Sequence, residues 1–381
     1  MAKDVLIYAD TLRSPELRHE VPATIADPFL YAETGGRAVA VVGSLDRDAL
    51  LAARPEVEVV APDDLGIDEI VAAASSIHEV EIELAARACA RLGIARAAVP
   101  PNFPVALADR LRADGLEIEP DADLFTLRRR AKTAAELEGV RRAQRAAEAG
   151  MRAAAEMLRA ARDTGDGNPL ELDGEVLTAE RLRDAIRHTF DEAGAASDEI
   201  LVAPGAQSAV GHVMGSGPIL AGQPLVIDLW PQDRASACFA DMTRTFVVGE
   251  PPEQVARWHT LCREALERST AAVRPGVHGR DVFGVACDVF EAAGIPTQRT
   301  KAQGEELRDG FFHALGHGVG LEVHEAPGLG RIGEPLVAGD VLAIEPGSYE
   351  QGFGGVRLED LVLVTDDGGE VLTDFPYDLA P

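Results

Sequence analysis

The sequence has very little lysine, although it is rich in charged residues. Lysine occurs only at Lys3, Lys132 and Lys301, so nearly all of the 36 basic residues are arginine, and 64 acidic residues give a net charge of −28. A chain of this charge repels nucleic acids and anionic membrane surfaces, which argues against both as partners. Two explanations of the acidic bias stay open: adaptation to a high-salt cytoplasm, or a GC-rich genome that favours arginine.

Long apolar runs and paired cysteines are also missing. No run approaches the roughly 20 apolar residues of a membrane-spanning helix, and the first residues, MAKDVLIYADTLRSPELRHE, hold only a short apolar stretch between two aspartates. We therefore expect a soluble, cytoplasmic protein. The cysteines stand apart from one another, which excludes thiolate zinc motifs and predicts buried free thiols. They are Cys89, Cys238, Cys262 and Cys287.

The length of the chain and its segment pattern predict two domains. A chain of 381 residues exceeds the usual size of one domain. Residues 1–128 contain short β-rich runs (DVLIYA, RAVAVVG, VEVVAP) and helical spacing in LDRDALLAA and EVEIELAARACARLG, which indicates a small α/β domain. Nothing in this region gathers histidine, cysteine and carboxylates, so a supporting or oligomerising role is expected.

The second domain, residues 129–381, is predicted to begin with a long helix. Thr133 and Glu136 have the spacing of a capping box, and the helix should run to about residue 162. A faint duplication follows, in which LRDAIRHTFDEAG (182–194) aligns without gaps with VFGVACDVFEAAG (282–294). Each copy follows a longer helix, at 134–162 and 252–273. A helix–helix–sheet unit used twice would bring two sheets together, with the helices outside and a cleft between the halves.

Four acidic residues in apolar surroundings are the first candidates for a functional site. Asp228 lies in PLVIDLW and Asp241 in FADMTRTFVV, whereas Glu345 ends the apolar run of GDVLAIEPG. Glu359 shares a strand face with Arg357 in GGVRLEDLVLV. A carboxylate among buried apolar residues is unfavourable unless it is paired or binds a metal. Each one alone is explained by a cap or a salt bridge, but together they favour a shared cation.

Three histidines lie in the glycine-rich segment FFHALGHGVGLEVHEAPG, at His313, His317 and His324. The spacing of His313 and His317 matches a zincin motif, which needs a helix and a glutamate after the first histidine. Here Ala314 follows, and the alternating glycines disfavour a helix, so we reject that interpretation. We expect one histidine to bind metal while the others face the cleft.

Five of these residues form a charge-balanced set for two divalent ions, since four carboxylates and a neutral imidazole match two dications. They are Asp228, Asp241, His317, Glu345 and Glu359. Such an oxygen-rich set favours Mn²⁺ or Co²⁺, with Zn²⁺ and Fe²⁺ as alternatives. Two ions about 3.5–4 Å apart can share a hydroxide that attacks at neutral pH, and the remaining histidines can pass protons to the leaving amine.

The order of these segments resembles a known enzyme superfamily. IDLW, ADMTRTF, HALGHGVGLEVHE, AIEPG and VRLED occur in the order found in the pita-bread metallopeptidases, which include methionine aminopeptidase, Xaa-Pro aminopeptidase, prolidase and creatinase-like proteins. The resemblance covers about residues 131–381. It implies an α+β fold, with a pita-bread catalytic domain after a smaller creatinase-like α/β domain. Because methionine aminopeptidases generally lack the N-terminal domain, the proline-specific branch is favoured.

The resemblance also implies roles for the metal ligands. Asp228 would chelate one ion with both oxygens, Asp241 and Glu359 would bridge the two ions, and His317 and Glu345 would complete one coordination sphere each.

Four further residues receive roles from the same resemblance. His212 would bind substrate, His324 would contact substrate near the scissile amide, His313 would line the pocket, and Arg357 would orient the metal-binding carboxylates. Trp230 departs from the family pattern, which commonly has a small residue two positions after the first aspartate, and it leaves the identity of the substrate open.

The implied activity is hydrolysis of the peptide bond before proline in a small peptide, by an Xaa-Pro aminopeptidase or an Xaa-Pro dipeptidase that forms a homodimer. A hydrolase of the same fold that acts on another C–N bond stays open, as does a non-catalytic peptide-binding protein. A metal-free amidinohydrolase of the creatinase type is disfavoured because all five ligands are present.

Overall fold

The computed structural model of the chain describes residues 3–165, 167–211 and 213–381. The chain divides into two compact units, Met1–Arg129 and Arg130–Pro381. Among the described residues, no helix combines the length and the apolar character that crossing a membrane requires. All four cysteines are free and buried, as expected from their spacing.

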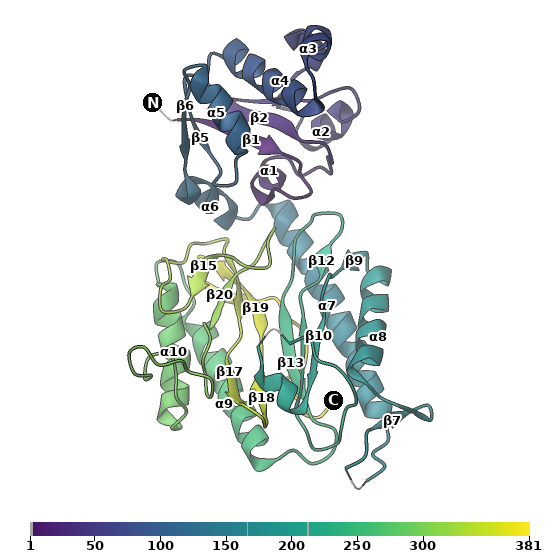
Figure 1. Ribbon diagram of the computed structural model, residues 1–381. Helices are drawn as coiled ribbons and strands as arrows, with labels where there is room; N and C mark the ends of the chain where they lie inside the picture. Colours follow the sequence, from purple (N-terminus) through teal and green to yellow (C-terminus); the bar gives the residue numbers. More distant parts are fainter. Residues whose placement is uncertain (1–2, 166, 212) are drawn as a thin grey trace. The chain divides into compact units, whose positions relative to one another are not determined.

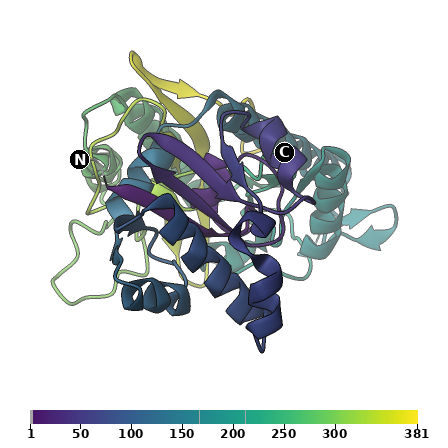
Figure 2. The same cartoon turned by 90° about the horizontal axis from the view of Figure 1, so that it is seen from above.

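The N-terminal unit is built on one six-stranded sheet of order β4-β3-β2-β1-β5-β6. β2 pairs antiparallel with β1 and β3, and the outer pairings are parallel. Figure 2 views the purple strands of this sheet from above, with the dark blue helices beside them. The strands are β1 (Asp4–Ala9), β2 (Phe29–Thr34), β3 (Arg37–Val41), β4 (Glu58–Val60), β5 (Arg96–Val99) and β6 (Glu117–Pro120). The helices are α1 (Pro15–Glu20), α2 (Arg47–Ala53), the 3₁₀ helix η1 (Pro62–Leu65), α3 (Ile67–Ala73), α4 (Ile77–Leu92), α5 (Val105–Ala113) and α6 (Ala122–Arg130).

Both faces of this sheet are buried, because successive side chains of a strand point to opposite faces. Leu6 and Leu30 belong to one apolar cluster, which includes Cys89 of α4. Ile7 and Tyr31 belong to a second cluster on the other face, which includes Leu17 of α1. The unit therefore has the α/β character that the alternating β-rich and helical segments predicted.

The first half of the C-terminal unit joins a helix pair to a three-stranded antiparallel sheet. Thr133 and Glu136 form the predicted capping box at the start of α7 (Ala134–Ala160), which ends two residues before the predicted limit. α8 (Ala179–Glu192) packs with α7 against the sheet β10-β11-β13. Those strands are β10 (Leu201–Pro204), β11 (Leu225–Leu229) and β13 (Met242–Phe246). Short elements complete this half: β7 (Glu171–Leu172), β8 (Glu175–Val176), β9 (Ala195–Ala196), η2 (Gly205–Ala209) and β12 (Gln232–Asp233).

The second half repeats this plan with a larger sheet. α9 (Glu253–Ala272) and α10 (Gly279–Ala292) pack on the five-stranded sheet β15-β14-β16-β19-β20. Its strands are β14 (Gly316–Gly318), β15 (Glu325–Leu329), β16 (Val341–Ile344), β19 (Asp360–Thr365) and β20 (Gly368–Val371), and the hairpin β17 (Gly347–Glu350) and β18 (Gly354–Arg357) lies beside it.

The duplicated helix–helix–sheet plan is visible in Figure 1, where α7 and α8 lie on one side of the strands and α9 and α10 on the other. The apolar positions that aligned between the two copies are all buried. Phe190 of α8, for instance, is 1% exposed, and its counterpart Phe290 of α10 is fully buried. The structure therefore confirms the duplication that the sequence indicated.

Candidate metal centre

Two paired strands bring the aspartates together. β11 and β13 run antiparallel, with Asp228 opposite Thr243 and Leu229 opposite Met242. Asp241 directly precedes Met242, one residue before the strand in which the sequence pattern placed it. The two carboxylates therefore sit at the same end of the strand pair. Asp241 is only 5% exposed.

A second strand pair supplies His317 and Glu345. β14 and β16 pair antiparallel, with His317 opposite Ala343 and Gly316 opposite Ile344, so that Glu345 follows directly after the pairing. A Cβ atom at Gly316 would overlap the carbonyl oxygen of Ala343. Glycine at this position therefore lets the histidine strand approach β16 closely. The glycines that ruled out a helix thus shape a strand.

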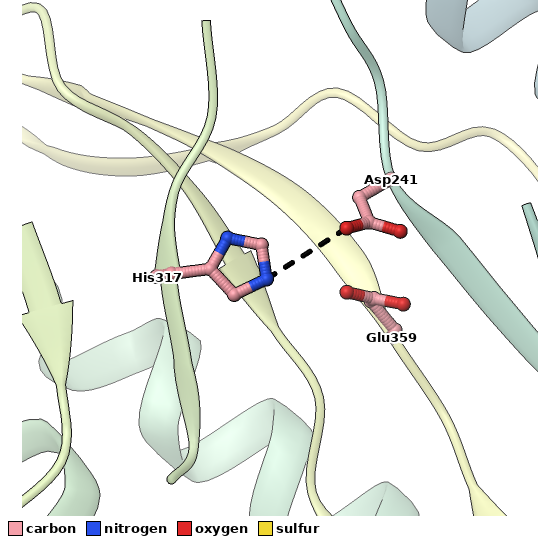
Figure 3. Close-up of side chains that lie close together, drawn as sticks. All are labelled: Asp241, His317 and Glu359. Carbon is pink, nitrogen blue, oxygen red and sulfur yellow. Dashed lines mark ion pairs between the residues drawn. The ribbon is translucent and has the colours of Figure 1, made fainter. Parts of the chain in front are cut away.

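Asp241, His317 and Glu359 converge from separate segments, as Figure 3 shows. One ligand atom from each lies within 4.8 Å of the other two. Nε2 of His317 is 3.7 Å from Oδ2 of Asp241 and 3.8 Å from Oε1 of Glu345. These separations are too long for hydrogen bonds, and they suit side chains that face a common cation.

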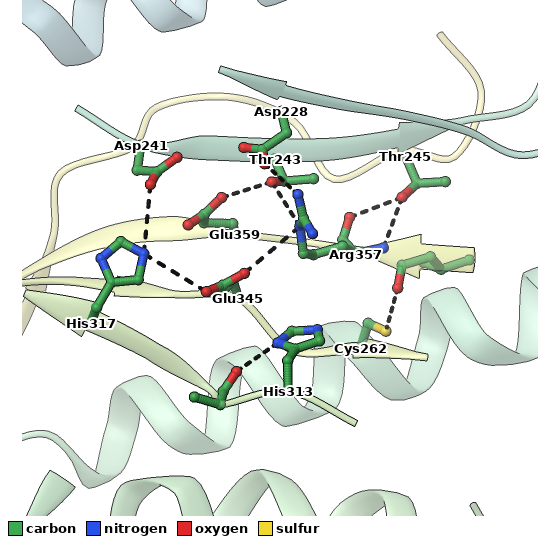
Figure 4. A network of polar contacts seen from close by, with 12 residues as sticks. Asp228, Asp241, Thr243, Thr245, Cys262, His313, His317, Glu345, Arg357 and Glu359 are labelled. Carbon is green, nitrogen blue, oxygen red and sulfur yellow. Dashed lines mark hydrogen bonds and ion pairs between the residues drawn. The ribbon is translucent and has the colours of Figure 1, made fainter. Parts of the chain in front are cut away.

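Arg357 and Thr243 hold the carboxylates in place (Figure 4). Arg357 donates from Nη2 to Oδ2 of Asp228 and from Nε to the Thr243 hydroxyl at 3.1 Å. The same hydroxyl donates to Oε2 of Glu359 at 2.7 Å. Oδ1 of Asp228 is buried and has no hydrogen-bond partner, which leaves a carboxylate oxygen available to a metal ion.

The protonation equilibria of the site indicate a shortage of positive charge. Burial, and then the neighbouring Glu359, raise the pKa of Asp241 well above its usual value. Burial, and then Asp228, raise the pKa of Glu359 likewise. Burial raises the pKa of Glu345 to about 7, although Arg357 opposes the shift.

The histidine in the cluster shifts in the opposite direction. Burial, and then His324, lower the pKa of His317 to about 4, so its imidazole is neutral near pH 7, as a metal ligand must be. The site thus combines buried carboxylates with raised pKa values, a neutral imidazole and an oxygen of Asp228 without a hydrogen-bond partner. Divalent cations bound there would supply the positive charge that the site lacks.

The structure places two of the three other predicted histidines near the metal centre. His313 is half-buried, and its Nε2 lies 2.9 Å from the Tyr349 hydroxyl. His324 is exposed, and its ring centroid lies 4.2 Å from that of His317. His212 lies outside the described residues.

A cavity of about 460 Å³ opens onto the cluster and contains all five predicted metal ligands in its wall, together with His313, His324 and Arg357. Its apolar wall includes Trp230, so the residue that departs from the family pattern faces the pocket. Several other lining residues were not singled out from the sequence. They are Glu199, Leu201, Met214, Phe312, Val323 and Tyr349. Phe312 and Val323 lie in the histidine segment, but their apolar side chains indicate no particular chemistry, and the others lie outside the quoted motifs.

Comparison with known proteins gives a family match over most of the C-terminal unit. The sequence profile of Metallopeptidase family M24 matches residues 138–366. The Xaa-Pro dipeptidase of Pyrococcus furiosus is 35% identical over 181 residues, which make up 46% of this chain and 47% of that protein. The chain thus spans about half the length of the curated relatives it matches.

Solved structures resemble the chain over almost its full length. An Xaa-Pro dipeptidase from Bacillus anthracis matches with a TM-score of 0.78 and 23% identity, over 99% of this chain and 94% of that one. An X-Pro aminopeptidase from Thermotoga maritima matches with a TM-score of 0.71 and 22% identity, over 99% and 95%. Together with the family match, this likeness confirms the predicted fold class, a smaller N-terminal α/β domain followed by a pita-bread domain.

Proposed function

The chain belongs to Metallopeptidase family M24, and from this premise we propose that it is a dinuclear-metal exopeptidase that hydrolyses the peptide bond before proline. The observation that carries the proposal is the buried carboxylate cluster with its shortage of positive charge. Family membership implies divalent metal ions. The proposal covers both an Xaa-Pro aminopeptidase and an Xaa-Pro dipeptidase.

We assign the metal ions to the five predicted ligands, Asp228, Asp241, His317, Glu345 and Glu359. Two ions balance the four carboxylates, and the oxygen-rich set with one imidazole favours Mn²⁺ or Co²⁺. Bound there, they would supply Lewis-acid activation of the scissile carbonyl and of a water molecule.

The chain's own residues prepare the site for this chemistry. Arg357 holds Asp228 by a charge-assisted hydrogen bond, and Thr243 holds Glu359, so both carboxylates keep a fixed orientation. His324 lies next to His317 at the pocket wall, where it can deliver a proton to the leaving proline nitrogen. His313, fixed by Tyr349, lines the pocket beside the substrate. We assign substrate binding to His212 as well.

A substrate panel tests the proposal. The protein, loaded in turn with Mn²⁺, Co²⁺ and Zn²⁺, is assayed with Xaa-Pro dipeptides, Xaa-Pro-Xaa tripeptides and Met-Xaa peptides of matched first residues. We expect turnover of at least one proline set with Mn²⁺ or Co²⁺. Turnover of Met-Xaa peptides alone would contradict the proposed specificity for proline. A protein that binds none of the three metals would contradict the proposal that it is a metal-dependent enzyme. Light scattering of the same sample tests the expected homodimer.

A further inference from the structure

A buried ion pair lies beside the histidine segment, apart from the residues assigned to the metal. Nζ of Lys132 donates to Oε1 of Glu325, and the two side chains are only 2% and 3% exposed. Burying two charges costs free energy that their attraction offsets only in part, and an apolar pair of similar volume is often at least as stable. Stability alone therefore does not account for charged residues here.

The lysine end of the pair stands on a rigid base. Lys132 directly precedes Thr133, the N-cap of α7, where the reciprocal bonds of the capping box, at 2.7 and 3.2 Å, fix the backbone. α7 is 27 residues long, and much of one face is buried. The ammonium group is thus held by the longest described helix of the unit.

The glutamate of the pair belongs to the segment that carries His317 and His324. Glu325 is the first residue of β15 and pairs with Gly318, which directly follows His317. His324 directly precedes Glu325, and its ring packs edge-to-face on that of His317. Fixing Glu325 therefore fixes both the strand pairing next to His317 and the end of the loop from which His324 projects.

The space around the pair is closed. A Cβ atom at Gly320 would lie 2.6 Å from both Cε of Lys132 and Oε1 of Glu325, so the backbone of Gly320 packs directly on the ion pair. A guanidinium is planar and larger than an ammonium group. This packing explains why one of only three lysines stands here in a chain whose other cations are nearly all arginine.

We propose that the Lys132–Glu325 ion pair positions His324 against His317 and thereby sets the geometry of proton transfer to the leaving group. The role of His324 in that transfer rests on the proposed function. Lys132 and Glu325 act through His324, since neither belongs to the pocket wall as the described residues define it.

The test replaces the pair by apolar residues of similar size. In Lys132→Met/Glu325→Leu no charge is left buried alone, so we expect cooperative unfolding with a Tm close to that of the wild type. Co²⁺ binding, followed by its visible absorption, should keep the wild-type stoichiometry. The kcat for the best proline substrate should fall roughly tenfold or more, with little change in KM.

A second buried ion pair supplies the matched control. Arg130 and Asp340 are 5% and 0% exposed, with Nη2 and Oδ2 2.6 Å apart, and neither is part of the pocket. Arg130→Met/Asp340→Leu should keep kcat within threefold of the wild type. A Lys132→Met/Glu325→Leu variant that also keeps its kcat would overturn the proposal. Lys132→Arg keeps the charge but not the fit below Gly320, and unchanged kcat in this variant would also overturn it.

A measurement without substrate separates this proposal from the proposed function. Imidazole ¹H–¹⁵N spectra of the Zn²⁺-loaded protein are recorded for wild type, Glu325→Gln and the double variant, and the His324 signal is assigned from its loss in His324→Asn. We expect the His324 signal to shift or to split in both variants, while the signal of His188, on α8 in the other half of the unit, stays in place. An unchanged His324 signal would refute the positioning role, whether or not the wild type cleaves proline peptides.

Discussion

Each unit of the chain contains a cluster of charged side chains, partly exposed in the N-terminal unit and buried in the C-terminal unit, and the two clusters behave in opposite ways. In the N-terminal unit, Arg128 donates to Glu20 at 2.7 Å and to both oxygens of Glu33, at 2.8 and 2.5 Å, while Arg54 lies 3.9 Å from Glu20. The Tyr31 hydroxyl donates to Glu33 at 3.1 Å. Glu20 and Glu33 thus meet two guanidinium groups, of which Arg54 also pairs with the exposed Glu56. Hydrogen bonding to Arg128 lowers the pKa of Glu33.

In the C-terminal unit, four carboxylates surround the single guanidinium of Arg357. The pKa of Asp241 and Glu359 is raised rather than lowered, because burial and mutual repulsion outweigh that one cation. Glu20 and Glu33 in the N-terminal unit thus have cationic partners within the chain, whereas the carboxylates of the C-terminal cluster need positive charge from outside the chain. The clustering of carboxylates alone is therefore not what marks the functional site. The deficit of positive charge is.

The largest effect should come from Glu359→Gln. The substitution keeps the shape of the side chain but removes the charge of the carboxylate assigned to both metal ions, so we expect peptidase activity to disappear while the fold persists. The measurement is kcat/KM on the best proline peptide, together with metal content and circular dichroism. Activity within tenfold of the wild type, about 1.4 kcal/mol in the barrier, would refute the assignment of Glu359.

The matched variant in the other unit is Glu33→Gln, which removes a partly buried carboxylate that already has Arg128 as its cation. Its activity per folded molecule should equal that of the wild type. If both glutamine variants lost activity equally, the distinction between the two clusters would collapse.

Metal removal should destabilise the C-terminal unit in a pH-dependent way. The pKa of Glu345 is about 7 in the folded chain and 4.5 as its ordinary value, so without metal this group stabilises the fold below about pH 4.5, and that contribution is lost as the pH rises through 7. The pKa shifts of Asp241 and Glu359 have the same direction. Bound cations replace those protons.

The rise in Tm that Mn²⁺ gives over an EDTA-treated sample should therefore grow from pH 5 to pH 8. The metal concentration is held constant across the series, and at a pH where it equals about 100 Kd each bound ion should add about 2.7 kcal/mol to the free energy of unfolding. Calorimetry at matched ionic strength measures the difference. A metal effect that is flat or that shrinks with rising pH would contradict the charge deficit.

Much of the site could be predicted from sequence, because an acidic residue within an apolar segment is visible from its immediate neighbours in the chain. Asp228 and Glu345 stand out as carboxylates in apolar strands, and the structure places both at one pocket. The Lys132–Glu325 pair could not be found in this way, since its members are 193 residues apart and nothing around Glu325, although it follows His324, indicates a lysine partner.

The fold shows the same division. The capped helix α7 and the duplicated helix pairs follow from local periodicity and were predicted. β2 was not predicted, because its first four residues, Phe29 to Ala32, are all buried and its sequence does not alternate between apolar and polar residues. Only pairing with β1 and β3 on both sides makes that segment a central strand.

A smaller effect, on stability rather than activity, is expected from Arg128→Met. The variant leaves Glu20 and Glu33 without their main cation, so the free energy of unfolding should fall by about 1–3 kcal/mol, with kcat of the folded protein unchanged. Urea unfolding measures the first quantity and steady-state kinetics the second. Lowering the pH toward 4 should narrow the gap to the wild type, because protonation removes the unpaired charges. A loss of kcat would show that the N-terminal cluster also serves the site.

The smallest effect should come from Trp230→Gly, which restores the small residue common in the family without touching either charged cluster. Trp230 lines the pocket but binds no metal, so metal content and Tm response to Mn²⁺ should match the wild type. Removing the indole enlarges the pocket, and we expect this to change the preference between competing substrates by about 1 kcal/mol. Relative kcat/KM for Xaa-Pro peptides with a large and a small first residue should therefore shift severalfold toward the large one. An unchanged ratio would mean that Trp230 does not select the substrate, and that other lining residues such as Phe312 and Val323 do so.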